Sequence, residues 1–156
     1  MITLSWEIIS ECQYKFRIVG IGVNREHSMY NMPEFQSSIL TNNDDASNQL
    51  VEWIVSSIRN HPGEKFQIVP NNSTPLLTRE TIIKLRKKNV DVPFVNRRNL
   101  YEALNVSRNE IISSIRKMHD SNERIDNVRW SFYSALEILI LQQMAGVTEF
   151  QGFKKS

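Results

Sequence analysis

The segment 65–73, with the sequence KFQIVPNNS, constrains the fold more than any other stretch of this 156-residue chain. Its apolar residues Phe66, Ile68 and Val69 predict a short buried strand between two helical segments. Pro70 cannot donate a hydrogen bond to a neighbouring strand, and the Asn-Asn-Ser run that follows it favours a turn. In open α/β sheets, ligands bind at the carboxyl ends of strands. We therefore expect any functional site at this end, where the residues are neutral amides and not carboxylates.

The composition is that of a globular intracellular protein. Hydrophobic residues make up 40% of the chain, and the net charge of +2 is too small for a polycation. The single cysteine, Cys12, excludes a disulfide framework and a cysteine-rich zinc site. Neither a signal peptide nor a membrane span is visible, so we expect no membrane partner. We predict one domain over residues 1–146 and a C-terminal tail over 147–156.

Hydrophobic periodicity predicts the order of the elements. Alternating apolar residues indicate two strands within residues 2–23, and residues 24–40 fit either a third strand or a packed loop. Helical spacing predicts helices over 46–60, 75–88 and 100–104, an extended segment over 90–95 and a last helix from about residue 122. Residues 110–118 are ambiguous, because Ile111, Ile115 and Met118 have helical spacing while Ile111, Ser113 and Ile115 alternate as in a strand.

Five motifs occur in a characteristic order. GIGV at 20–23 closes a strand, TNN at 41–43 precedes a helix, and FQIVPNN at 66–72 ends a strand. A segment rich in Lys and Arg follows, and HDSNERID at 119–126 opens the final helix. In this order and spacing the chain resembles the type 1 ribonuclease H family over nearly its whole length. The resemblance implies an α/β fold, with a ribonuclease H-like mixed sheet of five strands flanked by helices.

The resemblance also implies where an active site would lie. The family holds two divalent metals with four carboxylates, and its first, third and fourth ligand positions fall on Glu11, Asn71 and Asp126. The second falls within residues 46–49, which contain no acid, and we interpret the neighbouring Asp45 as a helix N-cap. The mobile histidine of the family falls on His119. Only Glu11 and Asp126 remain as candidate metal ligands, and Asn71 and His119 are vestigial candidates.

A site with about half the usual negative charge binds two Mg²⁺ ions poorly. We therefore expect no cofactor and no robust catalysis, and Mg²⁺ would take part only if the chain were an active nuclease. In the family, a basic helical insert holds the DNA strand of an RNA–DNA hybrid. The cations in the corresponding region are Lys84, Arg86, Lys87, Lys88, Arg97 and Arg98. Phosphate contact needs only cations along one face, although a solvated helical face would have the same composition.

The sequence thus indicates a catalytically degenerate ribonuclease H-like domain, a pseudoenzyme that binds RNA or an RNA–DNA hybrid or serves as a scaffold subunit with a protein partner. Trp53, Trp130, Phe132 and Tyr133 could form a partner surface, although aromatic residues at helical spacing are more often core. One alternative is a divergent but active metal-dependent ribonuclease H. Another is a helix-turn-helix DNA-binding protein built from residues 98–118. A strand over 110–118 would favour the ribonuclease H-like fold, and a helix would favour the helix-turn-helix motif.

Overall fold

The computed structural model describes residues 2–10, 13–23, 29–31, 39–121, 136–138, 140–141 and 144. The named elements are β1 (Ile2–Ile8), β2 (Phe16–Val23), β3 (Met29–Asn31), α1 (Asn43–Asn60), β4 (Phe66–Asn72), α2 (Pro75–Lys87), α3 (Arg97–Leu104) and α4 (Arg108–Ser121). The described residues between 136 and 144 are also helical. No helix in these ranges is long and apolar enough to cross a membrane.

The described strands form one mixed sheet in the order β3-β2-β1-β4. β1 pairs antiparallel with β2 and parallel with β4, and β2 pairs antiparallel with β3. The parallel register shifts after Trp6, so that Trp6 lies opposite Pro70 and Glu7 lies opposite Asn72. Asn71 is therefore the extra residue of a β-bulge at the carboxyl end of β4.

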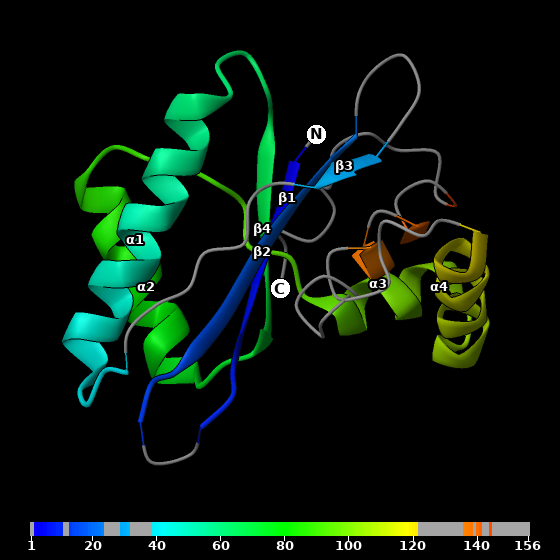
Figure 1. Cartoon of the computed structure of the whole chain (residues 1–156), viewed down its shortest axis with the longest axis horizontal. Coiled ribbons are helices and arrows are strands. Elements are labelled where there is room, and N and C mark those ends of the chain that lie inside the picture. The colour runs from blue at the N-terminus through cyan, green and yellow to red at the C-terminus, as the bar shows by residue number, and fades with distance from the viewer. Residues whose placement is uncertain are drawn as a thin grey trace.

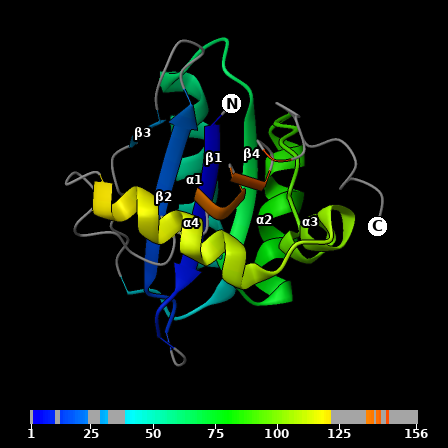
Figure 2. The same cartoon turned by 90° about the vertical axis from the view of Figure 1, so that its right-hand side faces the viewer.

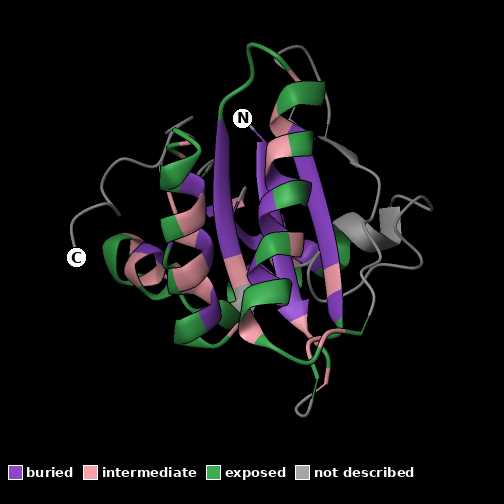
Figure 3. Cartoon of the chain, turned by 90° about the vertical axis from the view of Figure 1, so that its left-hand side faces the viewer, coloured by how far each residue is buried: buried purple, intermediate pink, exposed green. Residues whose placement is uncertain are grey.

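Helices cover both faces of the sheet (Figure 1). On the first face, even-numbered residues of β1 such as Leu4 and Trp6 pack against α1 and α2 in one apolar cluster. On the second face, Val19, Ile21 and Val69 pack in another cluster against α3, α4 and the described helical residues 136, 138, 140 and 141. Figure 2 shows α4 crossing the second face, and Figure 3 shows the strands buried between helices whose outer sides are exposed. Because both faces are covered, β1 is buried throughout except for the half-buried Ile8.

No fifth strand is found among the described residues: the segment 110–118, where it was expected, is helical, and the extended segment 90–95 forms only a single bridge. Phe94 forms an isolated parallel bridge with Ile68 at the outer edge of β4. The Ile68 amide donates to the Pro93 carbonyl at 2.9 Å, and the Val95 amide donates to the Ile68 carbonyl at 2.8 Å. Pro93 has no amide hydrogen, which limits the pairing of this segment. The prediction of five strands was therefore wrong for the described residues, although the fifth position beside β4 is occupied.

The ambiguous segment 110–118 is helical and forms most of α4. Asn105 ends α3 in the left-handed conformation, at φ 52° and ψ 45°, and the Ser107 hydroxyl accepts the Glu110 amide at 3.3 Å. Ile111 and Ile115, one helical turn apart, are both buried. Helical spacing, and not alternation, therefore describes this segment. A helix at 110–118 was expected to favour a helix-turn-helix motif over a ribonuclease H-like fold, but it occurs here beside the mixed sheet of an α/β fold.

Candidate functional site

A row of buried polar side chains crosses the second face of the sheet. Thr3, Ser5 and Glu7 alternate with the apolar residues of β1, and all three are buried. Gln67 donates to the Thr3 hydroxyl at 2.6 Å, and the Ser5 hydroxyl donates to the Val69 carbonyl at 2.7 Å. The row ends at Glu7, beside the bulge at the carboxyl end of β4. This is the sheet edge at which the sequence predicted a site.

Glu7 forms an ion pair with Arg17, its cross-strand neighbour on β2. Arg17 Nη1 lies 3.1 Å from Glu7 Oε1, and the Glu7 side chain is only 7% exposed. Burial raises the pKa of the Glu7 carboxyl above its usual value of 4.5, and the charge and hydrogen bond of Arg17 offset part of that rise. Arg17 Nε is also buried and has no hydrogen-bond partner among the described residues.

The raised pKa makes a prediction for Glu7→Gln. The contribution of Glu7 to stability is full below pH 4.5 and is lost as the pH rises through the folded-state pKa. Relative to the wild type, the variant should therefore gain stability as the pH rises above 4.5 and through the folded-state pKa of Glu7. Urea unfolding followed by circular dichroism would measure this change, with the exposed Glu52→Gln in α1 as a control that should show no such trend. A relative loss of stability over the same pH interval would mean that Arg17 outweighs burial.

A second buried carboxylate joins the C-terminal helical residues to α3 and α4. Glu137 is 2% exposed and lies between the buried residues Leu136 and Ile138. Arg97 Nη1 lies 2.9 Å from Glu137 Oε1, Arg108 Nε lies 3.6 Å from Oε2, and the Tyr101 hydroxyl donates to Oε2. Burial, reinforced by the hydrogen bond and charge of Glu137, raises the pKa of Tyr101 above its usual value of 10.0. We call Glu137, Arg97, Tyr101 and Arg108 the Glu137 cluster.

These side chains do not fit a pair of divalent metals. Such a pair requires several charged oxygen ligands that converge on one point. The carboxylate of Glu7 faces a guanidinium, and the carboxylate of Glu137 faces two. Within the described ranges, no group of three or more His, Cys, Asp or Glu side chains could hold a metal ion.

Most of the residues matched to the ribonuclease H active site have no described side chain. Glu11 and Asp126, like the tail 147–156, are outside the described residues. Asn71 is a residue of β4 and His119 is a residue of α4. The structure describes the backbone of both residues but not their side chains. The structure places Glu7 within the pairing of β1 with β4.

Asp45 and Ser47 take structural roles at the start of α1. The N-cap is Asn42, and not Asp45 as predicted, because the Asn42 side-chain oxygen Oδ1 accepts the Asp45 amide at 2.8 Å. Asp45 returns the interaction, since its carboxylate accepts from the Asn42 side-chain amide at 2.9 Å. Ser47 is buried where α1 meets α2, in the layer opposite to the face of Glu7. An acid restored near Ser47 would therefore not complete a site at Glu7.

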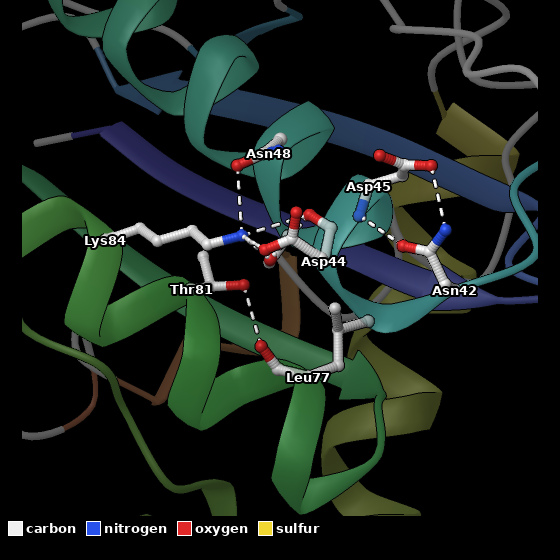
Figure 4. Close-up of polar contacts among 8 residues, drawn as sticks. Asn42, Asp44, Asp45, Asn48, Leu77, Thr81 and Lys84 are labelled. Atoms are coloured by element: carbon white, nitrogen blue, oxygen red, sulfur yellow. Dashed lines mark hydrogen bonds and ion pairs between the residues drawn. The ribbon is translucent and has the colours of Figure 1, made fainter.

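Lys84 bridges α2 to the start of α1 (Figure 4). Its ammonium lies 2.7 Å from Asp44 Oδ1, 2.6 Å from Ser47 Oγ and 3.0 Å from Asn48 Oδ1. It also lies 3.0 Å from the Asp44 carbonyl, so its three protons are fully used. Lys84 therefore already has partners within the protein, and the exposed cations are the stronger candidates for phosphate contact.

The other predicted cations divide between the two helical layers. Arg86, Lys87 and Lys88 are exposed at the end of α2, on the first face of the sheet. Arg98 is exposed on α3, on the second face, whereas Arg97 is held by Glu137. Trp53, considered for a partner surface, is buried in the first cluster, and Trp130, Phe132 and Tyr133 are outside the described residues. Four exposed cations therefore remain from the predicted set: Arg86, Lys87, Lys88 and Arg98.

The mixed sheet with a helical layer on each face is an α/β fold, and it is consistent with the ribonuclease H-like architecture expected from the sequence. Among solved structures, RuvC from Thermus thermophilus is similar, with a TM-score of 0.54 over 94% of this chain and 95% of that chain. Sequence identity is 8%, so this similarity establishes the fold alone. No protein-family model and no curated protein sequence matches the chain.

Proposed function

We propose that this chain is a ribonuclease H-like domain that binds nucleic acid and does not cleave it. The ion pair between Glu7 and Arg17 is the observation that carries this proposal. It puts a fixed guanidinium against the described carboxylate at the carboxyl end of β1, where a divalent metal would need several free oxygen ligands. The fold is similar to that of RuvC. Because the carboxylates of the described residues do not form a metal site, binding is the simplest function for such a fold.

The sequence of the neighbouring strand supports the same proposal. β4 has the sequence FQIVPNN and contributes no carboxylate at all. In the helical segment between residues 136 and 144, the one acidic residue is Glu137, which is engaged by Arg97, Tyr101 and Arg108. An active metal-dependent ribonuclease H is therefore not favoured by the carboxylates that the structure describes.

Binding would depend on the exposed cations Arg86, Lys87, Lys88 and Arg98. Each phosphate contact releases a counterion, so affinity should fall linearly on a log–log plot against salt concentration, with a slope of about −3 to −4 for these cations. Fluorescence anisotropy with labelled single-stranded RNA, an RNA–DNA hybrid and a DNA duplex would measure this slope. If none of the three nucleic acids bound at about 50 mM salt, the proposal would be contradicted. The alternative of a scaffold subunit would then be favoured.

A further inference from the structure

α3 and α4 form a compact helix-turn-helix unit on the second face of the sheet. The two helices are joined by residues 105–107 and cross each other, as Figures 1 and 2 show together. The turn depends on Asn105, whose left-handed conformation ends α3 and whose amide donates to the Tyr101 carbonyl at 2.8 Å. A short turn between two crossed helices is the geometry that proteins use to present a helix to DNA.

The inner side of this unit is fixed to the domain in two ways. Leu100, Ile111 and Ile115 are almost completely buried in the cluster that includes sheet residues of the second face. The Glu137 cluster adds polar contacts at both ends of the turn, because Arg97 and Tyr101 belong to α3 while Arg108 is the first residue of α4. The orientation of α4 is therefore set by the domain and does not depend on a flexible connection.

The outer side of α4 is a polar stripe that faces solvent. Successive helical residues are about 100° apart, so Asn109, Ser113 and Arg116 lie along one line, opposite to Ile111 and Ile115. All three outer residues are exposed, as is the flanking Glu110. Arg, Asn and Ser side chains are suited to hydrogen bonding with base edges in the major groove.

We infer that α4 is a DNA-contacting helix, which enters the major groove of double-stranded DNA with Asn109, Ser113 and Arg116 and is held in place by the Glu137 cluster. This inference rests on the proposed function and identifies its partner more closely. The major groove of B-form DNA admits an α-helix, whereas the major groove of A-form RNA is too narrow. Arg98, exposed on the preceding helix, would contact the DNA backbone, as the first helix of such units does.

The test compares duplex types and places acids on the outer stripe. The wild type should bind a mixed-sequence DNA duplex about tenfold or more tightly than an RNA duplex of the same sequence. The double variant Asn109→Glu plus Ser113→Glu should lose about tenfold or more of its DNA affinity, because two carboxylates would face the DNA. Both positions are exposed on a helix, so circular dichroism and thermal unfolding should match the wild type.

The control makes the same chemical change on the other layer. Ser56→Glu plus Asn60→Glu alters two exposed residues of α1 and should leave DNA affinity close to that of the wild type. Equal binding of DNA and RNA duplexes, or an unchanged affinity in the α4 variant, would overturn the inference while the proposed function stands. Absence of binding to any nucleic acid would overturn both.

Discussion

Substitution of Glu137 by alanine is expected to lower the free energy of unfolding by about 3–5 kcal/mol, the usual loss when one partner of a buried ion pair is removed. The variant leaves the guanidinium of Arg97, which is 21% exposed, and the half-buried hydroxyl of Tyr101 without their shared acceptor. Arg108 is 59% exposed and regains water, so it adds little to the loss. Urea unfolding followed by circular dichroism at neutral pH would measure the difference.

Two further variants separate the ion pair from simple packing. Glu102→Ala removes an exposed carboxylate from α3 and should change stability by no more than about 0.5 kcal/mol. Replacement of both Glu137 and Arg97 by methionine should recover much of the loss, because the two charges of the ion pair are then removed together. A Glu137→Ala variant as stable as the wild type would contradict the role of Glu137. A double methionine variant less stable than Glu137→Ala would also contradict it.

Removal of the cations at the end of α2 is expected to have the largest effect on the affinity for single-stranded RNA, because these cations lie on the first face of the sheet, away from the α4 surface proposed for DNA (Figure 1). Each phosphate contact contributes about fivefold at 0.15 M salt, so the triple substitution of Arg86, Lys87 and Lys88 by alanine should weaken binding by about 100-fold. The slope of log affinity against log salt should become shallower by about 3. The three residues are exposed, and the described contacts of α2 with α1 are made by other residues, such as Lys84.

Arg59→Ala is the matched control for this experiment. Arg59 is exposed in the last turn of α1, whereas Lys84, near the end of α2, contacts the first turn of α1. The two helix ends therefore lie at opposite ends of the same layer, and Arg59→Ala should leave affinity and slope nearly unchanged. An unaltered salt slope in the triple variant would exclude the end of α2 as a phosphate-binding surface. Arg98→Ala, measured separately, would show how much the cation on the second face of the sheet contributes to affinity.

Much of the fold could be predicted because its local patterns are strong. Alternation placed β1 and β2, and helical spacing placed α1 and α2, although α1 begins at Asn43, ahead of the predicted residue 46. The expected fifth strand at 110–118 is a helix, and the extended segment 90–95 forms one bridge because Pro93 limits its pairing. Residues 110–118 fitted two periods, and only the caps at Asn105 and Ser107 with the burial of the isoleucines decided between them.

The candidate site was predicted less well, because it depends on which face a side chain occupies. Glu7 could have been found from the sequence, since the apolar even-numbered residues of β1 place Thr3, Ser5 and Glu7 together on the other face. Glu11 lies outside the described residues, so its assignment as a ligand stays a prediction.

The remaining contacts join residues that are distant in the chain. Lys84 contacts Asp44 from 40 positions away, and Arg97 contacts Glu137 from the same separation, so local patterns could not predict either pair. A partial signal existed for Glu137, because a lone acid within an apolar helical run requires a buried partner.

The most direct test of the central claim is to measure binding and cleavage in the same samples. The protein would be incubated with a labelled DNA duplex and a labelled RNA–DNA hybrid in Mg²⁺, in Mn²⁺ and in a chelator. Native gels would report binding, and denaturing gels would report strand length. We predict a retarded complex with intact strands in every condition. Metal-dependent cleavage that is abolished by Glu7→Gln would contradict the account, because Glu7 would then act as a metal ligand and not as the ion-pair partner of Arg17.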